Sequence, residues 1–137
     1  MKVAYPAFIK KSSEMYAAYI PDFNGFTEGK DLCEAIEMAR EYIGNAIVGP
    51  TGDGDNLPEV SDEKQAREKA KESDSWFFDA PMSYIDVDVE AHRAIVRNVF
   101  VKKNCTLPYW LERKAEAAGL NFSQVLQEGL KEKLGIA

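Results

Sequence analysis

The end of the chain combines a short strand pattern with two short amphipathic helices, and this combination limits how the chain can fold. Residues 99–107 predict a strand that stops at Pro108, and residues 109–118 predict a helix that ends at Gly119. A second helix is predicted after Asn121 by apolar residues at helical spacing. These residues are Phe122, Val125, Leu126, Gly129, Leu130 and Leu134. A segment of about 40 residues cannot bury a sufficient core alone, so we expect it to oligomerise.

The first half of the chain predicts a small antiparallel sheet. Residues 3–9 and 15–20 are rich in aromatic and branched side chains and predict a hairpin, with Pro6 at an edge or a bulge. Residues 26–28 predict a brief third strand after a turn. Residues 83–89 alternate apolar and polar side chains, which predicts a fourth strand with one wet, acidic face.

Two helices are predicted between the third and fourth strands. Residues 31–47 carry one apolar stripe, and Asp31 can cap this helix, with Glu34 reaching back to it. Residues 63–72 favour a helix that is polar all round and therefore solvated. The aromatic run at residues 76–78 is expected to return the chain to the core.

Charge is divided unevenly along the sequence. Residues 93–137 contain eight Lys and Arg against four Glu, a net charge of +4, whereas residues 1–92 contain nine basic and nineteen acidic residues, a net charge of −10. The total is −6. An acidic front and a basic tail predict two domains, residues 1–92 and 97–137, with different partners.

Several classes of protein are disfavoured by composition. No apolar run reaches the roughly 18 residues of a membrane span, and Pro6 and two lysines interrupt the first residues, so we expect a soluble, cytoplasmic protein that does not bind membranes. Two cysteines and one histidine make neither a disulfide framework nor a His-based zinc site. We therefore expect no metal and no cofactor.

Acidic residues in the first half leave three alternatives open. Asp22, Asp86, Asp88 and Glu90 could form a two-metal carboxylate site, a docking face for a basic protein, or a solvated face. A metal site would need further acids from the first strand, which has none. His92 has no nucleophile at recognisable spacing. We therefore expect that the protein is not an enzyme.

Motifs in both halves resemble those of HicB-family antitoxins. The first half contains Tyr5-Pro6-Ala7, then a proline–aspartate–x–x–glycine stretch at residues 21–25, then the helix that begins at Asp31. In the second half, residues 104–111 and 121–128 resemble the corresponding parts of the ribbon-helix-helix DNA-binding fold of this family. The resemblance covers nearly the whole chain.

One segment and one residue depart from the family pattern. The loop and polar helix of residues 51–74 lie outside the resemblance, and Phe26 stands where many relatives carry a small residue or a cysteine. We interpret Phe26 as an adjustment of the core.

The resemblance implies an α+β chain with two roles. Residues 1–92 would form a β-β-β-α-β domain with a truncated RNase H-like fold, which binds and neutralises a HicA toxin, a small ribonuclease that cuts mRNA. Residues 97–137 would form a ribbon-helix-helix domain that pairs with a second copy, as a dimer or a tetramer, and represses the operon by binding its operator DNA.

The same resemblance selects candidate interface residues. Because Leu107 has to face inward ahead of its helix, the opposite parity of the strand would face the DNA major groove. The candidate DNA-binding residues are Lys102, Asn104 and Thr106 on the strand, and Asn121, Phe122 and Ser123 at the next helix, whose free amides would hold a phosphate. The candidate toxin-binding residues are Asp22, Phe23, Asp86 and Asp88.

Two other functions remain as alternatives. A stand-alone repressor would sense a small molecule in its first domain, with a pocket built from Tyr5, Tyr16, Tyr19 and Phe23. An RNase H-like nuclease would cleave nucleic acid by itself with Mg²⁺.

Overall fold

The computed structural model of the protein describes residues 1–54, 56–98 and 100–136. It divides the chain into two compact units, residues 1–100 and 101–137. The boundary predicted at residue 92 therefore falls inside the last helix of the first unit. The sequence did not predict this helix, because three of its first five residues, Glu90, His92 and Arg93, are polar. None of the described helices combines the length and the hydropathy that crossing a bilayer requires.

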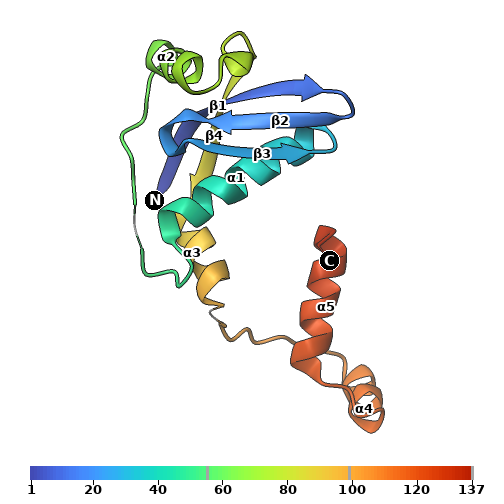
Figure 1. Cartoon of the computed structure of the whole chain (residues 1–137). Helices are drawn as coiled ribbons and strands as arrows, with labels where there is room; N and C mark the ends of the chain where they lie inside the picture. The colour runs from blue at the N-terminus through green and yellow to red at the C-terminus, as the bar shows by residue number, and fades with distance from the viewer. Residues whose placement is uncertain (55, 99, 137) are drawn as a thin grey trace. The chain divides into compact units, whose positions relative to one another are not determined.

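The first unit contains a four-stranded antiparallel sheet, which confirms the predicted α+β class and the four predicted strands (Figure 1). The strands are β1 (Lys2–Ser12), β2 (Met15–Ile20), β3 (Gly25–Gly29) and β4 (Met82–Asp88), in the order β3-β2-β1-β4. In β4 the expected alternation holds, since Ile85 and Val87 are buried and Tyr84 and Asp86 are exposed.

Pro6 lies where β1 is open on one side, as expected, although β1 as a whole is an inner strand and not an edge strand. It lies within β1, which has neighbours on both sides, and it is opposite Tyr84 of β4. The pairing of β1 with β2 begins only at Phe8, opposite Tyr19. Pro6 thus has no partner in β2, and its missing N–H removes no hydrogen bond from that ladder.

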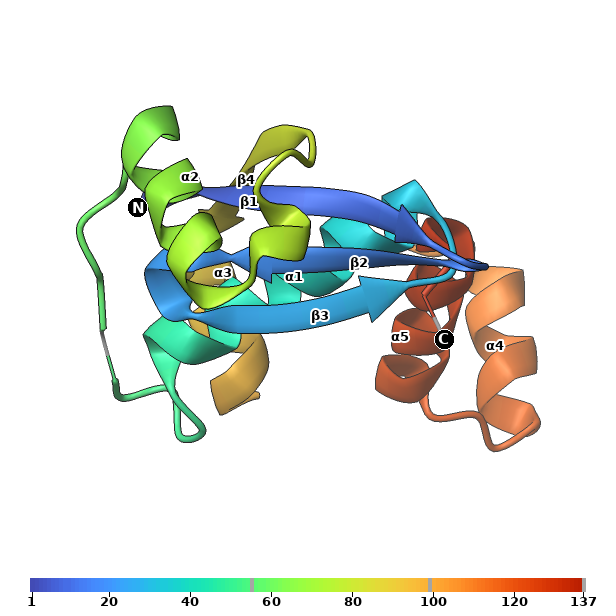
Figure 2. The ribbon, with the colours of Figure 1, turned by 45° about the horizontal axis from the view of Figure 1, so that its top comes forward.

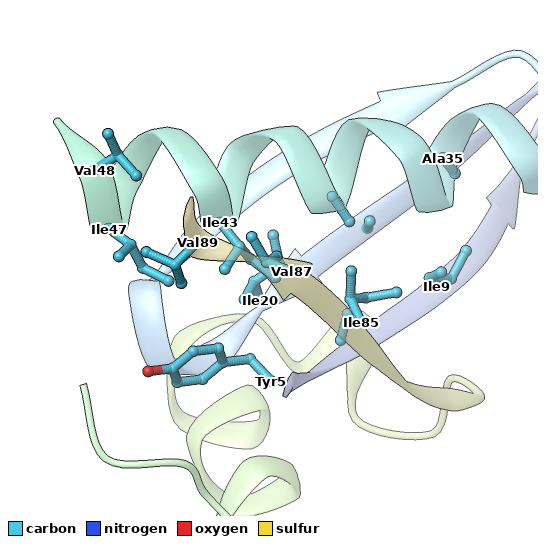
Figure 3. Packing of buried hydrophobic residues seen from close by; sticks show 13 residues of the cluster. Tyr5, Ile9, Ile20, Ala35, Ile43, Ile47, Val48, Ile85, Val87 and Val89 are labelled. Atoms are coloured by element: carbon cyan, nitrogen blue, oxygen red, sulfur yellow. The ribbon is translucent and has the colours of Figure 1, made fainter. Parts of the chain in front are cut away.

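One face of the sheet is covered by helix α1 (Leu32–Val48), as Figure 3 shows. The Asp31 carboxylate accepts a hydrogen bond from the Glu34 amide at 2.8 Å, which confirms the predicted cap. The Glu34 carboxylate reaches back to the amide of Lys30 at 3.3 Å, one residue before the expected one. The apolar stripe of α1 packs onto the sheet as predicted, except that Leu32 is exposed. The buried cluster on this face includes Tyr5, Ala7, Ile9, Ala18, Ile20, Ala35, Ala39, Ile43, Ile47, Ile85 and Val87.

The opposite face is covered in part by helix α2 (Glu63–Ser73) and a short 3₁₀ helix (Ser75–Phe77), as Figure 2 shows. Asp62 and Gln65 form a capping box at the start of α2. Ala66 and Ala70 are fully buried in a second cluster, with Phe8, Tyr19, Phe77 and Ala80. The prediction of a helix that is solvated all round is wrong, because two alanines one turn apart form a narrow packing stripe.

Helix α3 (Val89–Arg97) follows β4 directly and packs against α1. The carboxylate of Asp88 caps it by accepting a hydrogen bond from the amide of Ala91 at 3.1 Å. His92 lies against the C-terminal end of α1, where its Nε2 is 2.7 Å from Asn45 Oδ1. A Cβ atom at Gly44 would lie 2.6 Å from the His92 ring, so the close approach of α3 requires glycine there.

The second unit contains α4 (Tyr109–Ala117) and α5 (Phe122–Leu134). Gly119, at a φ of 71°, ends α4 as predicted. The predicted strand is absent, since residues 100–108 have no regular secondary structure; Val99 is outside the described residues. A strand needs a hydrogen-bonded neighbour, and none of the described residues of this single chain supplies one. Neither helix buries a residue.

The packing of α3 on α1 gives a first prediction. Gly44→Ala should lower the free energy of unfolding by about 1–3 kcal/mol, because the new methyl group meets the His92 ring. In a His92→Ala background the same change should cost much less, since the ring is gone and alanine favours a helix over glycine by about 1 kcal/mol. Urea unfolding, followed by the fluorescence of Trp76 with Trp110 replaced by Phe, measures both. Equal costs in the two backgrounds would contradict the contact.

Candidate protein and DNA interfaces

Asp22 is a buried structural carboxylate, which corrects its assignment to a toxin-binding surface. It lies in a 3₁₀ turn (Pro21–Phe23) after β2, and its side chain has no exposed area. It accepts hydrogen bonds from the amide and hydroxyl of Ser61 and from the ammonium of Lys69, the last at 2.8 Å. Lys69 also donates to the Ser61 hydroxyl at 2.9 Å. Both carboxylate oxygens of Asp22 thus accept hydrogen bonds inside the fold.

Tyr5 and Phe23 belong to the same structural arrangement. Their rings meet edge to face, with centroids 4.8 Å apart, and Phe23 is only partly exposed. The Tyr5 hydroxyl donates to the carbonyl oxygen of Pro58. Burial, and secondarily the Asp22 charge, raises the pKa of Tyr5 above its ordinary value, so the hydroxyl stays protonated as a donor. The motif residues Tyr5, Asp22 and Phe23 therefore fasten the long loop before α2 to the sheet.

The other predicted acids are exposed, but only Asp86 and Asp88 share a strand face. Asp86 pairs with Arg40 of α1 at 3.0 Å, and this hydrogen bond holds the pKa of Asp86 below its ordinary value. Asp88 is occupied as the cap of α3, and Glu90 lies in that helix rather than in β4. Within the described residues no group of acidic, histidine or cysteine side chains is placed to hold a metal ion. Asp86 and Asp88 are thus exposed on the edge strand β4, but each already has a structural role, one as an ion-pair partner and the other as a helix cap.

The sequence did not reveal an aromatic surface beside β3. Phe26 stacks on Tyr19 at 4.7 Å, and Phe77 lies 6.0 Å from Phe26. Trp76 and Phe78, which were expected in the core, are 40% and 42% exposed, and only Phe77 is buried. The ammonium of Lys10 lies 4.7 Å above the Trp76 ring. In the sequence, only the departure of Phe26 from the family pattern pointed to this surface. The Phe26 side chain is 49% exposed, so the interpretation of Phe26 as a core adjustment is wrong.

The predicted DNA-contacting residues of the second unit are exposed. Lys102, Asn104 and Thr106 lie in the extended segment before α4, but no strand fixes which way they face. The Asn121 side chain caps α5 by accepting from the Gln124 amide at 3.1 Å. The Gln124 side chain donates to Glu128 at 3.1 Å rather than reaching back to Asn121. The amide of Gln124 is thus in use, and those of Phe122 and Ser123 have no partner among the described residues.

Comparisons of the sequence find no matching family description and no matching curated protein. Among solved structures, the chain is similar to a chain of a toxin–antitoxin complex from Streptococcus pneumoniae, with 27% identity and a TM-score of 0.56. This similarity covers 97% of this chain and 99% of that chain. The crystal structure of the antitoxin HicB from Burkholderia pseudomallei matches with 16% identity and a TM-score of 0.48, over 97% of each chain.

The first match confirms the resemblance to toxin–antitoxin proteins that the motifs indicated. It extends over both units, so the likeness includes the two-helix end of the chain as well as the sheet.

The buried carboxylate gives a second prediction. Asp22→Ala should lower the free energy of unfolding by about 1–3 kcal/mol, because the buried Ser61 loses the acceptor of its amide and hydroxyl and the half-exposed Lys69 loses an ion pair. Asp86→Ala, which removes a carboxylate from an exposed ion pair, should change stability far less. Urea unfolding of both variants tests the distinction. Equal losses would show that Asp22 is not the structural centre of this loop.

Proposed function

We propose that this chain is the antitoxin of a type II toxin–antitoxin pair. The first unit would bind and neutralise a HicA-like, mRNA-cleaving toxin, and the second unit would bind operator DNA and repress the operon. The observation that carries this proposal is the similarity, over nearly the whole of both chains, to a chain of a toxin–antitoxin complex.

The distribution of charge between the units supports this division of roles. Residues 1–100 contain eleven basic and nineteen acidic residues, a net charge of −8, whereas residues 101–137 contain six basic and four acidic residues, a net charge of +2. A ribonuclease has to attract RNA phosphates and is therefore expected to be basic. The acidic first unit suits such a partner, and the basic second unit suits DNA.

The unburied second unit supports dimerisation. Four side chains of the apolar stripe of α5 are 41–54% exposed. They are Phe122, Val125, Leu126 and Leu130. A second copy would bury this stripe and would pair with residues 100–107 to form the two-stranded ribbon of a ribbon-helix-helix domain. We extend the proposal to a homodimer or tetramer of this kind, and to a truncated RNase H-like fold for the first unit.

The alternative functions find less support. Tyr5 and Tyr19 belong to different buried clusters on opposite faces of the sheet, so they do not line a common pocket for a sensed ligand. The acids that a nuclease would need already have other roles. Asp22 anchors a loop, Asp86 forms a surface ion pair with Arg40, and Asp88 caps α3. We therefore assign no catalytic step to this chain.

Co-expression tests the main proposal. The chain should co-purify with the HicA-like protein of the adjacent reading frame and restore the growth of cells that express it. Failure to form a complex, together with unrelieved toxicity, would overturn the antitoxin assignment.

The DNA-binding segment gives a third prediction. Replacing Lys102, Asn104 and Thr106 together with Ala should abolish specific operator binding, because each good base contact contributes about 1–3 kcal/mol and a dimer would lose six. Lys131→Ala with Lys133→Ala, at the far end of α5, serves as the control and should only weaken binding nonspecifically. Gel shifts at fixed salt measure both. Unchanged operator affinity in the triple variant would exclude the ribbon assignment.

The α5 stripe gives a fourth prediction. Leu126→Asp or Leu130→Asp should prevent dimerisation of the second unit, since burying an unpaired carboxylate costs several kcal/mol. Glu132→Asp on the same helix is the control and should remain dimeric. Light scattering at micromolar concentration measures the mass. A monomeric wild-type chain would contradict the dimer.

A further inference from the structure

The two outer strands of the sheet differ in how their open edges are protected. At the β4 edge, Arg40 crosses from α1 and donates to the backbone carbonyl of Asp86 at 2.9 Å, and it pairs with the Asp86 carboxylate as well. An incoming strand would have to displace this side chain. At the β3 edge, no hydrogen bond from a described residue outside β2 reaches the backbone of Gly25–Gly29. An edge of this kind is a template for another strand.

The β3 edge also carries a hollow of about 550 Å³. Its lining comes from both faces of the sheet. Phe26, which pairs with Tyr19, lies on the α2 side, whereas Thr27, which pairs with Ala18, lies on the α1 side. Met38 of α1 and Trp76 of the 3₁₀ helix complete the two walls. The hollow therefore follows the edge itself.

Side chains at this edge define the chemistry of its partner. Phe26, Met38 and Trp76 are 49%, 37% and 40% exposed, which is unusual for large apolar residues gathered in one place. The carboxylates that line the hollow are Glu28 and Asp74, and no lysine or arginine lines it. Apolar anchors with an acidic rim suit a segment that has both apolar and basic side chains.

We propose that the β3 edge is the surface that holds the basic toxin, and that an extended segment of the toxin adds to the sheet as a fifth strand beside β3. This inference rests on the proposed antitoxin function and assigns its binding surface. Main-chain hydrogen bonds to β3 give affinity, and Phe26 and Trp76 fill the spaces between alternate side chains of the added strand. Glu28 and Asp74 select a basic segment. The proposed surface is therefore the β3 edge rather than the predicted residues Asp22, Phe23, Asp86 and Asp88.

Amide hydrogen exchange of the full-length chain, alone and in complex with the HicA-like toxin, tests the mode of binding. The amides of β3 should exchange more slowly in the complex, while those of β4 should change little. Protection at β4 without protection at β3 overturns the inference. Protection of β3 that rises with concentration in the chain alone also overturns it, because a second copy would then occupy the edge.

Two surface variants test the side chains. Glu28→Lys and Phe26→Ser should each weaken toxin binding by about tenfold to a hundredfold, as losses at the centre of an interface do. Glu68→Lys on α2 and Tyr84→Ser on β4 are matched controls, with an exposed acid and an exposed aromatic residue elsewhere on the first unit. These controls should bind within about twofold of the wild type.

The outcomes separate the two proposals. If the wild type does not bind the toxin, the proposed function fails and this inference fails with it. If the wild type binds and Glu28→Lys binds equally well, the antitoxin function stands and the β3 surface is wrong. Glu28 has an exposed side chain without a structural partner among the described residues, so the result for Glu28→Lys does not depend on whether Phe26→Ser folds.

Discussion

The first unit depends on a central strand that buries side chains on both of its faces. Along β1, Tyr5, Ala7 and Ile9 pack under α1, while Phe8 packs under α2. An antiparallel sheet with one wet face would need only one covering layer. Here the second layer is small, and it leaves β3 and the outer part of β4 partly uncovered. The sheet therefore has a well-packed centre and an open edge at β3.

A single carboxylate connects this sheet to the segment that covers its second face. Asp22 holds both the loop residue Ser61 and the helix residue Lys69, so the turn after β2 fixes where α2 begins. Tyr5 fastens the same loop at Pro58 from the central strand. Since α2 and the following 3₁₀ helix position Phe77 and Trp76, the aromatic surface beside β3 depends on this buried anchor. Asp22, which the sequence suggested as a partner-binding acid, thus acts indirectly, because it positions the aromatic surface beside β3.

The second unit follows a different physical logic. A short chain with two amphipathic helices gains too little from burial to offset its conformational entropy. Its extended segment likewise lacks a hydrogen-bonding neighbour in one copy. In the proposed function, the pairing of two chains would remove both deficits. The resulting two-fold symmetric dimer would match a symmetric operator. In the proposed function, folding of this unit and DNA recognition are therefore one process.

The sequence by itself determined the features that depend on near neighbours. The alternation in β4, the stripe of α1, the cap at Asp31 and the stop at Gly119 are all encoded within a few residues, and local periodicity reports them directly. Tertiary structure decided which distant segment each residue packs against. Pro6 lies in an inner strand because β2 ends early, and Ala66 and Ala70 are buried because Phe8 and Tyr19 present a facing surface. Asp22 is buried because residues 39 and 47 positions away reach it. Periodicity shows that a face exists, but only the packing of distant segments shows what covers it, and that packing left the β3 edge open.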